Sequence, residues 1–129
     1  MYPKVKDIDR KYLEGCVDEG WFDLILELRD KIVAIDPNCE SHQIKEKFGG
    51  LRFYIGGSTK EVFDLISKAE LKSYSICEKC GKPGKCRDNT GWYKTLCENH
   101  HKARIDENKK RQETFRKKYV KHNTKSKEG

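Results

Sequence analysis

Residues 77–100 read CEKCGKPGKCRDNTGWYKTLCENH, and this stretch holds two pairs of metal-binding residue types. Cys77 and Cys80 form the first pair, and Cys97 and His100 form the second, each with two residues between its members. Zinc prefers four tetrahedral thiolate or imidazole donors, and a two-residue spacer lets one tight turn present two donors to the same ion. The pattern therefore predicts one zinc ion held by these four residues.

Two neighbouring residues are rival ligands. Cys86 has no second donor at short spacing, and His101 lies one residue farther from Cys97 than His100 does. We prefer His100 because the two-residue spacer is commoner in zinc sites. The first cysteine pair could instead be a redox motif, but that motif needs a strand–helix setting, and the surroundings here are rich in turn residues.

Four protein donors leave no open position on the ion, so the predicted zinc is structural rather than catalytic. A segment this short cannot bury enough surface to fold unaided, and structural zinc supplies about 10–16 kcal/mol in comparable peptides. We expect a strand from Trp92 to Leu96 that delivers Cys97. We also expect Trp92, Tyr93 and Leu96 to join this segment to the preceding helix.

A β-hairpin is predicted upstream, over residues 42–55. Gly49-Gly50 separates two strand-like runs, and a two-residue glycine loop supplies the positive φ angles of a tight hairpin turn. With this turn, Phe48 pairs with Leu51 and Ile44 with Ile55, while Glu46 falls on the apolar face opposite Phe53. The residues of that apolar face are Ile44, Phe48, Leu51, Phe53 and Ile55. The residues of the opposite face are Lys45, Lys47, Arg52 and Tyr54.

Helices are predicted on either side of the hairpin. The first covers about residues 18–35, with Asp18 as its cap and Pro37 after its end. Its apolar stripe is Trp21, Leu24, Ile25, Leu28, Ile32 and Ile35. The second covers about residues 59–74, and Ser58 with Glu61 forms a capping box at its start. Its buried side is expected to hold Val62, Phe63, Ile66 and Ala69.

These elements predict an α+β fold, in which a helix–β-hairpin–helix core is followed by a zinc ribbon and a basic C-terminal helix. We divide the chain into a core over 1–75, the zinc ribbon packed on the core over 76–101, and a basic helix or tail over 102–129. The net charge of +7 is concentrated in the last part, where residues 102–129 carry 11 basic and 4 acidic side chains. Residues 1–76 carry 12 basic and 14 acidic side chains.

Two basic surfaces are candidates for binding a partner. The polar face of the hairpin, formed by Lys45, Lys47, Arg52 and Tyr54, could contact phosphates, although a plain solvated face is the simpler interpretation. The basic side chains of the C-terminal region could hold nucleic acid or merely keep a frayed helix in solution. They are Lys109, Lys110, Arg111, Arg116, Lys117, Lys118 and Lys121. Phe115, Tyr119 and Val120 could dock on a partner, on a second copy of the chain or on the chain's own core.

Composition excludes several other classes. The chain has 129 residues with 35% hydrophobic and 38% charged residues, and no apolar run is long enough to span a membrane. The start, Met1 to Lys4, lacks the apolar stretch of a secretory signal, so we expect a cytoplasmic protein. Four of its six cysteines crowd into residues 77–97, which in a reducing compartment favours metal over disulfides. Motifs of metalloproteases, phosphate loops, nucleophile elbows and zinc deaminases are absent from the sequence.

Three stretches together resemble a group of short, uncharacterised bacteriophage and prophage proteins. They are QIKEKFGGLRFY at residues 43–54, CEKCGKPG at 77–84, and GWYKTLC at 91–97 followed by His100. The resemblance spans about residues 20–101 and implies a phage setting, with the host cytoplasm as location, and a Cys3His zinc ribbon. It defines no catalytic residues that could be carried over to this chain.

The leading hypothesis is a small phage-encoded zinc-binding protein that is not an enzyme. It would bind and modulate a host macromolecule, with a host protein as the expected partner, in host takeover or as an inhibitor of a defence system. The first alternative is a nucleic-acid-binding protein that uses the basic C-terminal helix and the hairpin face. The second alternative is a zinc-ribbon nuclease of the His-Asn-His type, with separate roles for His100 and His101.

Overall fold

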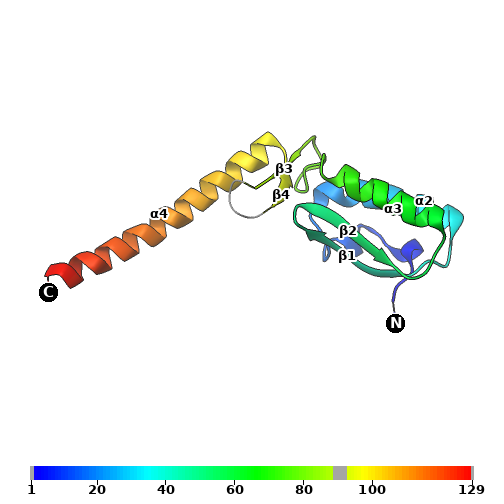
Figure 1. Ribbon diagram of the computed structural model, residues 1–129, viewed down its shortest axis with the longest axis horizontal. Coiled ribbons are helices and arrows are strands. Elements are labelled where there is room, and N and C mark those ends of the chain that lie inside the picture. Colours follow the sequence, from blue (N-terminus) through cyan, green and yellow to red (C-terminus); the bar gives the residue numbers. More distant parts are fainter. Residues whose placement is uncertain (1, 89–92, 129) are drawn as a thin grey trace.

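The computed structural model describes residues 2–88 and 93–128, with side chains described as far as residue 113. Figure 1 labels the larger elements, and η denotes a short 3-10 helix in the text. In chain order they are η1 (Val5–Asp7), α1 (Arg10–Leu13), η2 (Glu19–Trp21), α2 (Phe22–Ile35), β1 (Ser41–Lys47), β2 (Gly50–Ile55), α3 (Lys60–Ser73), β3 (Lys85–Arg87), β4 (Lys94–Leu96) and α4 (Glu98–Glu128). The mixture of helices with two small antiparallel hairpins confirms the α+β class.

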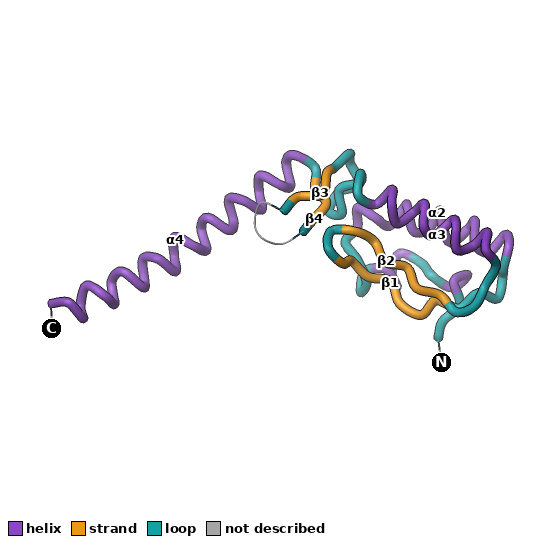
Figure 2. Tube along the Cα trace, viewed as in Figure 1, coloured by secondary structure: helices purple, strands orange, loops and turns teal. Residues whose placement is uncertain are grey.

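The core forms between a layer of two helices and a hairpin. α2 and α3 lie side by side, and the β1–β2 hairpin lies against them (Figure 2). The stripe predicted on the first helix is buried from Trp21 to Ile32, but Ile35 at the helix end is 39% exposed. On α3, Val62, Ile66 and Ala69 are buried as predicted, whereas Phe63 is 46% exposed and lies outside the core.

The N-terminal segment completes this core, although the sequence shows little periodicity there. Val5, Ile8, Leu13 and Val17 are all buried in the same cluster as the α2 stripe. The backbone N–H of Ser41 donates to the Pro3 carbonyl at 2.8 Å, so the N-terminal segment also covers the start of the β1 edge.

The hairpin faces were predicted correctly except for Phe48, and the predicted register is wrong. The turn residues are Phe48 and Gly49, both with positive φ (55° and 84°), which places Lys47 opposite Gly50 and Ile44 opposite Phe53. Phe48 is therefore at the tip and 60% exposed instead of sharing the apolar face. The second glycine is needed in the strand, because a Cβ on Gly50 would lie 2.2 Å from the Tyr74 ring.

α3 satisfies the outer edge of β2 with side chains. Ser73 Oγ accepts the Leu51 N–H at 2.9 Å, and Glu70 Oε2 accepts the Phe53 N–H at 2.9 Å. An uncovered strand edge invites pairing with other chains, so these two hydrogen bonds also close that edge.

Both predicted helix caps differ in detail. Thr59 caps α3 by accepting the Val62 N–H, and Ser58 Oγ donates to Asp36 Oδ2 at 2.7 Å instead. Asp18 makes no side-chain cap, and its carboxylate pairs with Lys79 Nζ at 3.0 Å. In both cases the side chain that was predicted to cap the helix makes a tertiary contact instead.

The second hairpin and α4 follow the core. β3 pairs with β4 in antiparallel register, and α4 begins directly after Cys97 and extends away from the core (Figure 1). Within the described part of the chain, no helix combines the length and apolar character needed to cross a membrane.

Candidate metal centre

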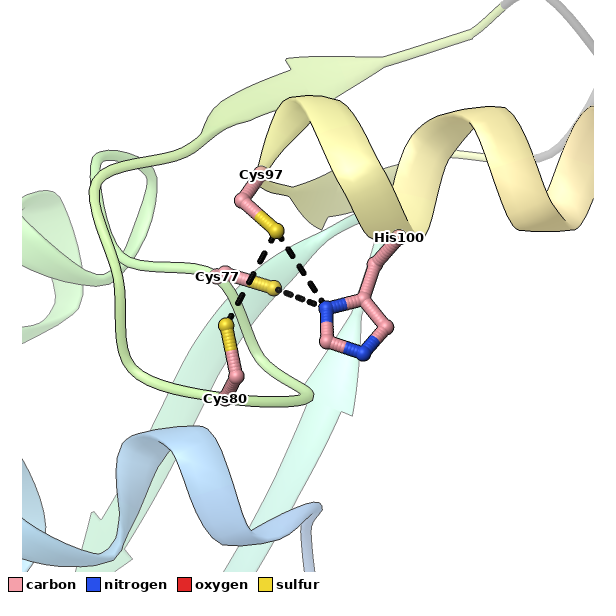
Figure 3. Close-up of side chains that lie close together, drawn as sticks. All are labelled: Cys77, Cys80, Cys97 and His100. Carbon is pink, nitrogen blue, oxygen red and sulfur yellow. Dashed lines mark hydrogen bonds between the residues drawn. The ribbon is translucent and has the colours of Figure 1, made fainter.

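Cys77, Cys80, Cys97 and His100 converge on one point (Figure 3). Their donor atoms all lie within 4.8 Å of one another. Cys80 Sγ is 3.8 Å from Cys97 Sγ, and His100 Nδ1 is 3.2 Å from Cys97 Sγ and 3.6 Å from Cys77 Sγ. All three cysteines are free thiols rather than disulfide partners. This arrangement is compatible with a single metal ion, and soft thiolate with imidazole is a donor set that could bind zinc.

The first donor pair comes from a tight turn. The Gly81 N–H donates to the Cys77 carbonyl at 2.8 Å, and the Cys77 N–H donates to the Lys82 carbonyl at 2.8 Å. Gly81 has a φ of +82°, a conformation that suits glycine. The Lys82 backbone N–H lowers the pKa of the Cys80 thiol, but desolvation and hydrogen bonds with the neighbouring thiols outweigh it and leave this pKa raised.

The second donor pair comes from the start of α4. Cys97 immediately precedes the helix, and a hydrogen bond from the His100 backbone N–H to its sulfur lowers the pKa of Cys97 to about 6. A helix N-terminus stabilises a thiolate because its first N–H groups have no partner within the helix. His100 lies one turn into α4, so the helix itself fixes the distance between the two donors.

The core holds this segment through η2. The Gly20 N–H donates to the Glu78 carbonyl at 2.7 Å, and Trp21 Nε1 donates to the Ile76 carbonyl at 2.9 Å. A Cβ on Gly20 would lie 2.1 Å from the Cys77 carbonyl oxygen, so only glycine permits this approach. The turn over residues 76–82 that carries Cys77 and Cys80, here called the metal turn, is thus held on the core by hydrogen bonds to its backbone carbonyls.

A second set of contacts joins the segment to the hairpin tip. Thr95 Oγ1 donates to the Gly49 carbonyl at 2.6 Å. Lys94 Nζ lies 3.3 Å from Glu78 Oε1 and 3.7 Å from Glu46 Oε1. Burial raises the pKa of the Glu78 carboxyl, and the Lys94 ammonium opposes this rise in part. The carboxylates of Glu46 and Glu78 therefore both form ion pairs within the fold.

The cluster contains His100 rather than its rival His101. His101 is 7% exposed, and no hydrogen-bond partner for its Nδ1 is found among the residues described. Cys86 is exposed, and its Sγ lies 3.9 Å from the Phe48 carbonyl. Tyr93 is 48% exposed and its ring meets Phe48 at the hairpin tip, whereas Leu96 is buried next to Cys77 and Cys97. Contact of these residues with α3 stays a prediction. Trp92 lies outside the described residues.

The predicted partner-binding residues fall into three groups. Lys45, Lys47, Arg52 and Tyr54 share one hairpin face as predicted, with Lys45 opposite Arg52. Arg52 Nη2 donates to the Tyr74 hydroxyl at 3.2 Å, so this guanidinium is partly engaged within the fold. Lys109, Lys110 and Arg111 are exposed on α4. The remaining residues lie in the part of α4 whose side chains are not described; they are Phe115, Arg116, Lys117, Lys118, Tyr119, Val120 and Lys121.

Sequence reasoning found the donors but missed what holds them. The contacts of Gly20, Glu78 and Thr95 cross long stretches of chain, and spacing gives no signal for them. Comparison of the chain with protein-family models, with curated proteins and with solved structures found no match.

Proposed function

We propose that this protein is a phage-encoded binding protein that acts on a host macromolecule without catalysing a reaction, and that one structural zinc ion organises its second half. The observation that carries the proposal is the convergence of four protein donors on one point. Four donors fill the coordination sphere of zinc and leave no position for a water or a substrate, which is typical of structural sites.

Donor distances support zinc as the ion. With zinc–sulfur bonds of about 2.3 Å and zinc–nitrogen bonds of about 2.0–2.1 Å, a regular tetrahedron separates two sulfurs by about 3.8 Å and a sulfur from a nitrogen by about 3.5 Å. The corresponding distances in the chain are 3.8 Å between Cys80 and Cys97, and 3.6 Å and 3.2 Å from His100 to Cys77 and Cys97.

A binding role is a better account than a nuclease of the His-Asn-His type. Such a nuclease needs a separate set of residues for its catalytic metal. Among residues 2–88 and 93–113, this is the one close group of three or more Cys, His, Asp or Glu side chains. The group is occupied by the proposed structural ion, so a nuclease would need ligands from elsewhere.

α3 offers a surface for a host protein. Leu71 is 73% exposed and Phe63 is 46% exposed on this helix. We propose that these two side chains belong to a surface that meets a partner, because contiguous exposed apolar patches mark protein interfaces. We therefore keep a host protein as the first candidate partner.

Affinity capture from host cells, with the zinc-loaded chain as bait, tests the proposal. We expect a stoichiometric partner that is recovered by the unaltered protein and lost with Cys77→Ser, and mass spectrometry and nuclease treatment identify its class. Recovery of no stoichiometric protein or nucleic acid would contradict the proposed function.

Charge favours nucleic acid as a second candidate partner. Residues 102–129 carry a net charge of +7, and residues 106–114 contain no apolar side chain. α4 extends away from the core (Figure 1), and Lys102, Lys109, Lys110 and Arg111 are exposed on the part of it whose side chains are described. Basic residues bind the phosphate backbone and release its counterions, which makes the affinity fall steeply with salt.

Deletion of residues 102–129 tests this second function. The shortened chain keeps Cys97 and His100, so it should retain one zinc ion per chain while losing a gel shift with duplex DNA at low salt. A gel shift that survives the deletion, or one that is insensitive to salt, would contradict binding through α4.

A further inference from the structure

Two exposed aromatic rings meet where the hairpin tip touches the second half of the chain. Phe48 lies in the β1–β2 turn and Tyr93 immediately precedes β4, and they are 60% and 48% exposed. Their ring centroids are 6.3 Å apart with an interplanar angle of 85°. This edge-to-face pair leaves much of both rings open to solvent, although aromatic rings gain most when they are buried.

The backbone holds Phe48 at the tip in a strained conformation. Its φ of +55° is uncommon for a bulky residue, and glycine or asparagine occupies this position of a two-residue hairpin turn with less strain. Strained residues of this kind are concentrated at ligand-binding and active sites. The chain therefore keeps a ring at a position where a smaller residue would make a better turn.

One basic side chain lies beside these rings, and a second lies on the same face of the hairpin. Lys47 Nζ lies 5.5 Å from the centroid of Phe48, and Lys45 Nζ lies 5.9 Å from the centroid of Tyr54. The carboxylate of Glu46, on the same strand, is engaged internally, because it accepts the Gly49 N–H at 2.7 Å and pairs with Lys94. A partner for this tip must offer flat π surfaces together with negative charge.

We infer that the hairpin tip is a binding site for single-stranded nucleic acid, in which Phe48 and Tyr93 stack on unpaired bases and Lys45 and Lys47 contact the phosphates. Every nucleobase has a π face, and stacking on exposed aromatic side chains beside basic residues is the usual means of binding single strands. A duplex hides those faces within its own stack. The inference rests on the proposed role of the chain as a binding protein, and it adds a site separate from α4.

Fluorescence anisotropy with a labelled oligothymidylate and the zinc-loaded full chain tests the site. Phe48→Asn and Tyr93→Ala should each weaken binding by about tenfold, the scale of one lost base–aromatic stack. Asparagine tolerates the positive φ of the turn, so Phe48→Asn should not lower the unfolding temperature. Tyr12→Ala removes an exposed ring from α1 and should leave the affinity unchanged.

Three further readouts separate this site from the other candidates. The single strand should bind at least about tenfold more tightly than a duplex of the same length, since only it exposes its bases. An oligonucleotide that carries iodouracil should cross-link to Phe48 or Tyr93, located by mass spectrometry. Tyr93→Phe keeps a ring and should restore most of the affinity.

The inference would be overturned if both aromatic variants bound the oligonucleotide as tightly as the unaltered chain. If deletion of residues 102–129 abolished binding while both aromatic variants kept the affinity of the unaltered chain, the nucleic acid would be assigned to α4. If polyglutamate displaced the oligonucleotide equally well from the unaltered chain and from the aromatic variants, the tip would be assigned to an acidic peptide. Absence of binding to any oligonucleotide would overturn this inference alone, because metal content and partner capture test the proposed function separately.

Discussion

Gly20 lies where the core and the metal turn come closest together. A Cβ at this position would lie 2.1 Å from the Cys77 carbonyl oxygen and 2.4 Å from the Glu78 carbonyl oxygen. Both contacts are with backbone, which cannot swing aside as a flexible side chain would. Even the Cβ of an alanine at position 20 would therefore clash with the backbone of the metal turn.

Gly20→Ala should lower the free energy of unfolding of the zinc-loaded protein by about 1–3 kcal/mol, the usual cost of overpacking. Gly15→Ala is the matched control, because its Cβ would meet only the Tyr12 carbonyl oxygen at 3.8 Å. The control should change stability by less than about 0.5 kcal/mol. Urea denaturation of both variants measures the difference, and equal effects would mean that this contact is not tight in solution.

The donor residues allow a second comparison between similar side chains. Cys77 is fully buried within the cluster, whereas Cys86 is exposed and outside it. Cys77→Ser should reduce bound zinc from about one ion per chain to nearly none, since structural sites use all four donors. Cys86→Ser should leave zinc content unchanged. Metal analysis of the purified variants gives the result, and zinc loss in the Cys86 variant would point to a different ligand set.

At the scale of elements, α3 stabilises the hairpin through polar contacts as well as apolar ones. Ser73 is fully buried, and its Oγ accepts the Leu51 N–H at the edge of β2. Ser73→Ala should cost about 1–3 kcal/mol, because it leaves a buried N–H without an acceptor. Ser75→Ala is the control, since Ser75 is exposed and its hydroxyl donates to the Lys72 carbonyl within the same turn. Thermal unfolding should show a larger loss of stability for Ser73→Ala than for Ser75→Ala, and the opposite result would contradict this role of α3.

Much of the element order could be predicted from sequence, because its causes are local. The stripe of α2 and the four donors follow from spacing alone, and both are found in the structure. Apart from Phe48, the hairpin faces were correct because a register error of two residues keeps the strand side chains on their own sides. The observed register follows from a turn at Phe48 and Gly49 instead of Gly49 and Gly50, and the packing of the Tyr74 ring against Gly50 is a tertiary contact that local sequence does not reveal.

The missed features share the same cause. β3 is three residues long and has no alternating pattern of its own, and it forms only by pairing with β4. The N-terminal segment has apolar residues without helical or strand periodicity, yet it completes the core. Exposure of Phe48 and Tyr93 follows from where the hairpin tip meets the second half of the chain, so their pairing could not be read from spacing.

At the scale of the whole molecule, the core and the segment that follows it from Cys77 onward differ in how much buried apolar surface stabilises them. The core cluster runs from Val5 to Ala69 and is built from α2, α3, the hairpin and the N-terminal segment. Within the described residues, the buried apolar cluster of the second half contains Cys77, Leu96 and Cys97, and two of these are proposed metal donors. Without the ion, Leu96, the hydrogen bonds to the core and the ion pairs of Lys94 would have to order this segment.

Removal of zinc should therefore unfold the second half while the core stays folded. After treatment with EDTA, the amides of Cys77, Glu78 and Gly81 should exchange with solvent much faster, because they donate to the carbonyls of Lys82, Thr95 and Cys77, which all lie in the second half of the chain. The amides of Leu51 and Phe53, which α3 holds, should keep most of their protection. Hydrogen exchange followed by mass spectrometry measures both groups in one experiment.

The same experiment decides how tightly the two halves are coupled. Return of zinc should restore protection of the metal turn, and zinc at a hundredfold excess over its dissociation constant should stabilise that segment by about 2.7 kcal/mol. Simultaneous loss of protection in both groups would mean that Gly20 and Trp21 transmit the metal's stabilisation to the core, so that the chain folds as one unit. Unchanged protection in the metal turn would contradict a structural role for the ion, because the segment would then be folding on its backbone contacts alone.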